Sequence, residues 1–143
     1  MKRSAALLVG TIVTATTLSG CGGGSAYCDA AQKNKSALEG FGKTRTNAAF
    51  AKLDQVIKSM AKTSPSAVRK DWQAIGAGLE GVIAAQKKVN LRLEDVDAKS
   101  AGKLTTAQQK ALNTAYTAFN AAVKDHGAVV VKNVKQECKI VIK

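Results

Sequence analysis

Residues 68–89, "VRKDWQAIGAGLEGVIAAQKKV", decide the fold because their large apolar side chains recur at the spacing of one helix face. The members of this series are Val68, Trp72, Ile75, Leu79, Val82 and Val89, interrupted only by Gln86. Steps of three and four residues place side chains on one side of an α-helix, where a neighbouring element buries them. Ser64 and Pro65 precede the series and are typical of an N-cap followed by the first helical position. The sequence therefore predicts a long amphipathic helix after Ser64.

Gly76, Gly78 and Gly81 in this stretch have the G-x-G-x-x-G spacing of a dinucleotide site. Such a site needs a strand before the first glycine. Here the residues before Gly76, "SAVRKDWQA", already have the pattern of a helix, so we expect no cofactor. We interpret the glycines as positions where another backbone or a ring comes close, with Phe119 or Phe50 opposite them. A slot for an apolar ligand at Gly76, Gly78, Gly81 and Phe119 is the functional version of this interpretation.

Three further helices are predicted. One covers residues 49–62, one begins at the capping box formed by Thr105 and Gln108, and a weaker one starts the domain. The helix over residues 49–62 has the apolar face Phe50, Leu53, Ile57 and Met60. The helix that begins at Thr105 has the face Leu112, Ala115, Phe119, Ala122 and His126. The helix that starts the domain has the face Tyr27, Ala31, Leu38 and Phe41, and Gly40 and Gly42 end this helix. The chain is therefore expected to be all-α, an antiparallel four-helix bundle.

Two segments leave alternatives. Gly127 allows a break, so the last stretch is either a short fifth C-terminal helix or an extension of the fourth, and residues 139–143, "KIVIK", are either a docked tail or a strand. Residues 91–104 form the longest connection, which Leu91, Leu93 and Val96 should hold against the bundle. Its acids, Glu94, Asp95 and Asp97, lack the glycine and closing glutamate of a calcium loop, so we expect a solvated loop.

The chain opens with Lys2 and Arg3, followed by an uncharged run and "LSGC" at residues 18–21. This arrangement is typical of an export signal. "LSGC" resembles the lipobox of bacterial lipoproteins, which implies cleavage before Cys21 and a diacylglyceryl group, with palmitate as an expected acyl chain, on its thiol. An uncleaved anchor helix is the alternative, but the run is short and holds four threonines.

The expected domains are a lipoprotein signal peptide at 1–20, a lipidated cysteine with a glycine-rich tether at 21–25, and one helical domain at 26–143. The expected location is the extracytoplasmic face of the cell membrane. Without Lys2 and Arg3, 20 basic and 10 acidic side chains remain. This charge either attracts anionic lipid or a wall polymer or serves solubility. No nucleic-acid partner is expected, because the basic residues are scattered without aromatic or base-reading side chains among them and the chain is expected to be exported.

Cys28 and Cys138 remain once Cys21 is assigned to the lipid. They lie near opposite ends of the mature chain, in an oxidising compartment, and we predict that they form a disulfide. A reactive thiol pair is the alternative, but neither belongs to a C-x-x-C motif.

Catalytic constellations are lacking. The one histidine, His126, falls on the apolar seam, where a core or boundary role fits better than a base or metal ligand. No nucleophile elbow, serine–lysine pair or phosphate loop occurs. We expect no catalytic residues, no metal site, no cofactor and no enzyme activity.

The lipobox, "YCDA" at 27–30, "SPSAVRKDW" at 64–72 and "KQEC" at 135–138 are similar to small alanine-rich secreted lipoproteins of high-GC Gram-positive bacteria. The resemblance implies an anchored helical domain and transfers no active site; Lys139 departs from it, standing where a glycine is expected. Three functions follow as hypotheses: a non-catalytic interaction module with an unknown envelope or protein partner, a carrier or sensor of a small apolar ligand, and a phage-exclusion lipoprotein.

Overall fold

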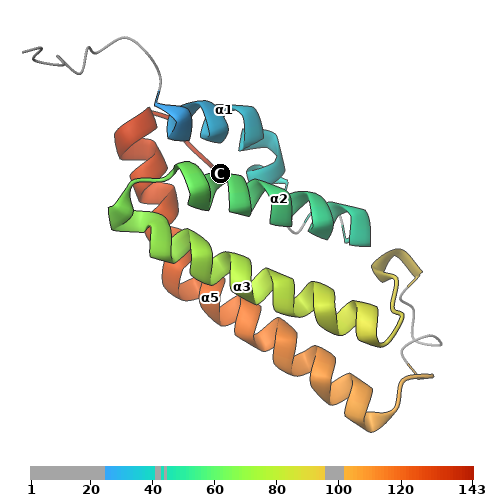
Figure 1. The fold of residues 1–143 in the computed structure, drawn as a ribbon. Helices are drawn as coiled ribbons and strands as arrows, with labels where there is room; N and C mark the ends of the chain where they lie inside the picture. The colour runs from blue at the N-terminus through green and yellow to red at the C-terminus, as the bar shows by residue number, and fades with distance from the viewer. Residues whose placement is uncertain (1–24, 41–42, 44, 96–101) are drawn as a thin grey trace, which may run out of the picture.

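The computed structural model describes residues 25–40, 43, 45–95 and 102–143. In these ranges the chain forms four α-helices, one 3₁₀ helix and no strand. The elements are α1 (Ala26–Glu39), α2 (Asn47–Thr63), α3 (Ser66–Lys88), η1 (Leu93–Asp95) and α5 (Thr106–Cys138) (Figure 1). The predicted all-α class is confirmed.

Several predictions fall on residues that lie outside the described ranges. These are the signal peptide at 1–20, the lipidated Cys21, the tether at 22–24, and the positions Phe41, Gly42, Val96 and Asp97. The helices of the described part include none with the length and apolar character needed to cross a bilayer.

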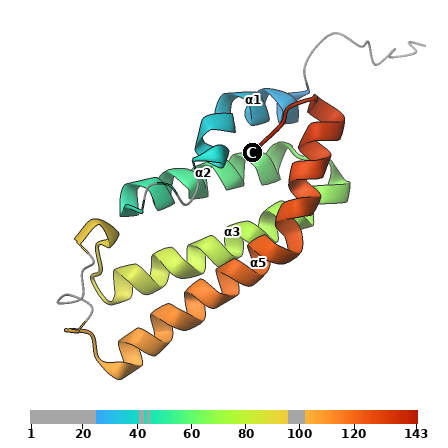
Figure 2. The same ribbon diagram turned by 180° about the vertical axis from the view of Figure 1, so that it is seen from behind.

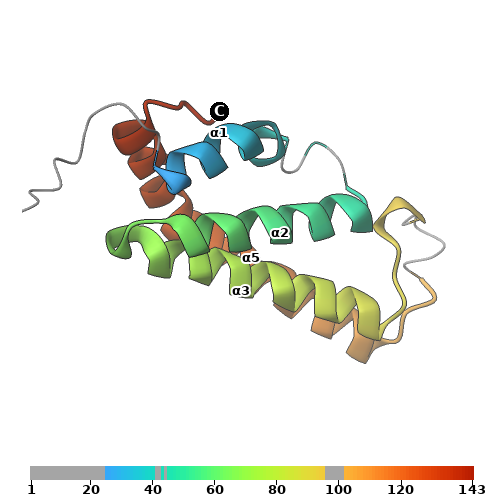
Figure 3. The ribbon, with the colours of Figure 1, turned by 45° about the horizontal axis from the view of Figure 1, so that its top comes forward.

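α3 packs against both α2 and α5, as Figures 1 and 3 show. Its stripe from Val68 to Val82 is buried, and Leu79 and Val82 have no exposed surface. Burial of one such side chain contributes about 1.5–3 kcal/mol. Gln86 continues the stripe at 2 % exposure, and its Nε2–H donates to the Tyr116 hydroxyl at 2.7 Å. The polar interruption in the series is therefore a partly buried hydrogen bond between α3 and α5.

The junction of α2 and α3 differs by one residue from the prediction. Pro65, not Ser64, occupies the N-cap of α3, which begins at Ser66. Ser64 instead ends α2 and is buried, with its hydroxyl donating to the Ala61 carbonyl at 3.1 Å. Arg69 Nη2 in turn donates to the Ser64 carbonyl at 2.8 Å. The tight turn thus satisfies its own polar groups while α3 folds back along α2.

α5 is one helix of 33 residues. It starts in the predicted capping box, since Thr105 Oγ1 accepts from the Gln108 N–H at 3.2 Å and Gln108 Oε1 accepts from the Thr105 N–H at 2.9 Å. The helix continues through Gly127, so the final stretch is an extension and not a separate fifth helix. Figure 2 shows that α5 bends: its first half follows α3 and its second half turns toward α1.

The end of the chain is a docked tail and not a strand. Ile140 and Ile142 pack against the core, and the Lys143 N–H donates to Glu39 Oε1 at 3.3 Å. Cys28 and Cys138 form the predicted disulfide, with their Cα atoms 5.1 Å apart. Figure 3 shows the tail beside α1. The described core lies wholly between Tyr27 and Ile142, so residues 22–143 contain all of it.

Candidate functional site

The three glycines of α3 have different surroundings. A Cβ built on Gly78 would lie 3.0 Å from the Phe119 Cα, and one on Gly76 would lie 3.2 Å from the Ile57 Cγ2. A Cβ on Gly81 would meet nothing within 4 Å. Of the three glycines, Gly78 is therefore the one that lies against α5, whereas Gly81 faces open space on the surface.

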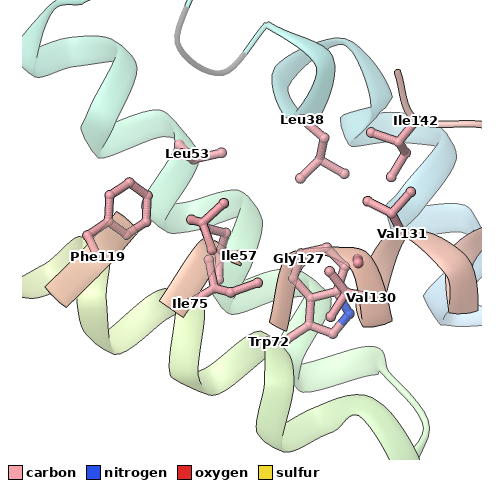
Figure 4. A pocket seen from close by; sticks show the side chains of 12 residues that line it. Leu38, Leu53, Ile57, Trp72, Ile75, Phe119, Gly127, Val130, Val131 and Ile142 are labelled. Atoms are coloured by element: carbon pink, nitrogen blue, oxygen red, sulfur yellow. The ribbon is translucent and has the colours of Figure 1, made fainter. Parts of the chain in front are cut away.

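An apolar cavity of about 320 Å³ lies between the helices (Figure 4). It is lined by Leu38 of α1, Leu53 and Ile57 of α2, Trp72 and Ile75 of α3, Phe119, Val123, Gly127, Ala128, Val130 and Val131 of α5, and Ile142 of the tail. Of the four residues predicted for a ligand slot, Phe119 lines this cavity. The three glycines of α3 do not.

The cavity has a buried floor and a partly exposed mouth. Residues of the floor, such as Ile57, Trp72 and Phe119, are at most 3 % exposed. The mouth residues Leu38, Val123, Gly127, Val131 and Ile142 are half-buried, and Ala128 is exposed. The cavity therefore opens on the side where α5 faces α1 and the tail.

Gly127 explains why space remains on this side of α5. Residues 119, 123, 127, 130 and 131 share one helix face at steps of three and four, and Gly127 carries no side chain between two valines. A Cβ on Gly127 would meet only the Val123 Cγ1, at 3.6 Å. The sequence signal is thus a glycine inside an apolar face, which from the sequence alone indicates only a position where the helix can break or bend.

The cavity wall offers almost no hydrogen-bonding groups. The Trp72 Nε1–H points to the Tyr27 hydroxyl at 3.1 Å, a buried hydrogen bond between α3 and α1. Burial raises the pKa of Tyr27, against the opposing effect of this hydrogen bond, so the phenol stays neutral at physiological pH. The remaining lining side chains are hydrocarbon. The arrangement is suited to apolar binding and not to acid–base chemistry.

His126 lies beside the cavity without lining it. Its Nδ1 is 2.7 Å from Asp71 Oδ1, a contact that joins α5 to α3, and the two side chains are 36 % and 20 % exposed. This is a boundary position, as the sequence favoured. The described residues contain no group of three or more histidine, cysteine or acidic side chains that could hold a metal ion.

A second hollow, between α1 and α2, differs in character. Asp29, Lys33 and Lys52 contribute to its lining, together with Asn34 and Gln55. Charged, solvated groups of this kind bind water well and offer little apolar surface, so the cavity around Trp72 is the stronger candidate.

The described residues define an all-helical domain closed by a disulfide around an apolar cavity. No family model, curated protein or solved structure matches the chain. The resemblance to alanine-rich secreted lipoproteins stays a prediction, and the argument for function rests on the cavity.

Proposed function

We propose that the protein is a lipid-anchored, non-catalytic binding module on the outer face of the cell membrane, and that a small apolar molecule occupies its cavity. The observation that carries the proposal is the apolar cavity of about 320 Å³. Ligand sites in proteins are mostly apolar clefts of about 300–1,000 Å³.

The arrangement of the helices supports binding. We take them as one antiparallel bundle, in which the cavity follows the space between α5 and the α2–α3 pair. Helix bundles build ligand sites between facing helices in this way. The lipobox-like "LSGC" at 18–21 supports the location, because an anchor there keeps the domain close to a source of apolar molecules.

The test is a titration of residues 22–143, oxidised at Cys28 and Cys138, with 1-aminonaphthalene, a neutral dye of ten carbon atoms whose emission shifts to shorter wavelength in apolar surroundings. The variant Gly127→Leu places a branched side chain in the cavity. Its matched control, Gly127→Ala, adds one methyl group where only the Val123 Cγ1 lies within 4 Å. We expect saturable binding by the wild type and by Gly127→Ala, and at least a tenfold weaker affinity for Gly127→Leu.

Unfolding does not explain such a loss, because both variants replace a glycine inside α5. Alanine and leucine favour a helix over glycine by up to about 1 kcal/mol, so both variants should melt no lower than the wild type. No binding by the wild type, or equal binding by all three proteins, would contradict the proposal.

The other hypotheses stay predictions. A protein or wall-polymer partner on the outer surface should be recovered by crosslinking in intact cells. A phage-exclusion role predicts a changed phage susceptibility when the gene is deleted. The expectation that the protein is not an enzyme likewise awaits an assay.

A further inference from the structure

We propose that the ligand is a single-chain anionic amphiphile, with its hydrocarbon chain in the cavity and its carboxylate or phosphate at the mouth beside Lys124 and Lys135. This inference rests on the proposed function and adds the chemical class of the ligand. Four features carry it: the volume of the cavity, its length, its lining and the charges at its mouth.

The volume fits one chain. A cavity of about 150 Å³ accommodates benzene, with its six carbons. The cavity described here is about twice that size, so it has room for roughly twelve carbon atoms. A two-chain membrane lipid exceeds this volume, whereas one medium-length chain fills it.

The cavity is elongated. Phe119 and Val131 both line it and lie twelve residues apart on α5, a separation of at most about 18 Å because α5 bends (Figure 2). Figure 4 shows the lining side chains in a row, from Phe119 at one end to Val131 and Ile142 at the other. A linear chain matches this shape better than a compact ring system does.

The lining excludes a polar group from the interior. Trp72 is the one residue of the floor with a polar side-chain atom, and its N–H is already bonded to Tyr27. A charged or hydroxylated group inside the cavity would lose its hydration without a replacement partner, which is strongly unfavourable. The head group of an amphiphile must therefore remain at the mouth.

Lysines stand at that mouth. Lys124 lies four residues before Ala128, and Lys135 lies four residues after Val131, so both are on the side of α5 that borders the opening. Both lysines are exposed. Their flexible side chains carry ammonium groups that can reach over the edge of the cavity toward an anion.

An acid beside this edge, Glu39, is already engaged. Glu39 follows Leu38, and its Oε1 lies 3.8 Å from Lys35 Nζ and accepts from the Lys143 N–H at 3.3 Å. Lys35 itself lies three residues before Leu38 on α1. Lys35, Lys124 and Lys135 therefore outnumber Glu39 beside the opening, and their charge complements an anionic head group.

The experiment measures displacement of the neutral dye by four ten-carbon compounds: decanoate, decyl phosphate, decan-1-ol and decyltrimethylammonium. All are used below their micelle concentrations with residues 22–143 in about 0.15 M salt, where the Debye length is about 8 Å and distant charges are screened. We expect at least one of the two anions to bind at least tenfold more tightly than the cation. The tighter anion identifies the head group as a carboxylate or a phosphate.

The charge-reversal variant is Lys124→Glu with Lys135→Glu, and its control is Lys70→Glu with Lys110→Glu. The control pair is also exposed, lies outside the cavity lining and changes the net charge equally. The mouth variant should lose the preference for anions while still binding the neutral dye. The control should keep the preference.

The outcomes separate the two proposals. Dye binding without preference among head groups, or an equal loss in both variant pairs, overturns the anionic ligand and leaves the apolar site intact. Failure of the wild type to bind the dye overturns both.

Discussion

Gly78 and Gly81 lie one turn apart on α3, and a methyl group has opposite consequences at the two positions. At Gly78 it would sit 3.0 Å from the Phe119 Cα, so α3 and α5 must separate. We expect Gly78→Ala to lower the free energy of unfolding by about 1–3 kcal/mol. Gly81→Ala meets nothing within 4 Å and should raise it by up to about 1 kcal/mol through helix propensity. Urea denaturation of the two variants measures both effects, and changes of the same sign would contradict the packing.

The burial of the Tyr27 phenol beside Trp72 should appear in the pH dependence of stability. Burial raises the folded-state pKa of Tyr27 above its ordinary value of 10.0. The stability that comes from the neutral phenol is therefore complete below about pH 10 and is lost as the pH rises above it. Tyr27→Phe should lose about 1–3 kcal/mol at pH 8, because the Trp72 N–H is left buried without its partner.

The same variant should be less sensitive to alkali. Between pH 8 and pH 11 the wild type should lose more stability than Tyr27→Phe, as measured by chemical denaturation at each pH. Deprotonation of lysines affects both proteins, so the difference between them reports on Tyr27. Parallel pH profiles would show that Tyr27 does not titrate differently in the folded and unfolded states.

At the scale of the elements, hydrogen bonds of Asn47 join the start of α2 to residues 91–94, the segment that follows α3. Its Nδ2–H donates to the Leu91 carbonyl at 3.0 Å, and its Oδ1 accepts from the Leu93 N–H at 3.1 Å. Its backbone N–H also donates to Glu94 Oε2 at 3.0 Å, which is the main cause of the lowered pKa of that carboxyl. The segment is thus held where the sequence predicted only a solvated loop with apolar contacts.

Asn47→Ala removes the two side-chain hydrogen bonds and keeps the backbone one. We expect a loss of about 1–3 kcal/mol and faster hydrogen exchange at the Leu93 amide. Asn113→Ala is the matched control, because Asn113 is exposed on α5 and its replacement should change stability by no more than about 0.5 kcal/mol. Unchanged exchange at Leu93 would show that the side chain of Asn47 is not what holds the segment.

The helices were predictable because caps and periodicity are local. The Thr105–Gln108 box and the stripe from Val68 to Val82 act within a few turns of chain. The start of α3 lies one residue later than predicted, because serine can end a helix as well as begin one. Here the Ser64 hydroxyl donates to the Ala61 carbonyl, and Ser64 is the C-cap of α2. The cavity was not predictable, because it depends on what four helices and the tail together fail to fill. Gly127 indicated that a side chain is missing from the apolar face of α5. The residues of the other helices and the tail that face this position could not be identified from the sequence.

At the scale of the whole molecule, the disulfide between Cys28 and Cys138 holds the tail that completes the cavity. The two cysteines are 110 residues apart, and a bridge across a loop of this length contributes about 2–5 kcal/mol. We expect Cys28→Ser combined with Cys138→Ser to lower stability by this amount, as measured by urea denaturation.

The double variant should also bind the dye more weakly at a temperature where it is still folded, because Ile142 is no longer held at the mouth. Near-ultraviolet circular dichroism establishes that tertiary packing persists under the conditions of the titration. Unchanged affinity in a folded double variant would mean that the tail is not needed for binding.

The same bond also makes the domain a closed covalent ring. Residues 28–138 lie within it, and they include α2, α3, all of α5 and all of α1 except its first two residues. One cut by a protease anywhere inside the ring leaves a single molecule, because each new end remains joined through the bridge to the residues before α1. A domain held at its N-terminal side is released in one of two ways. Either the chain is cut inside the ring and the disulfide is also reduced, or the chain is cut once before Cys28. At the proposed extracytoplasmic location, where proteases are common and reductants are scarce, this connectivity would protect against loss of the domain as well as against unfolding.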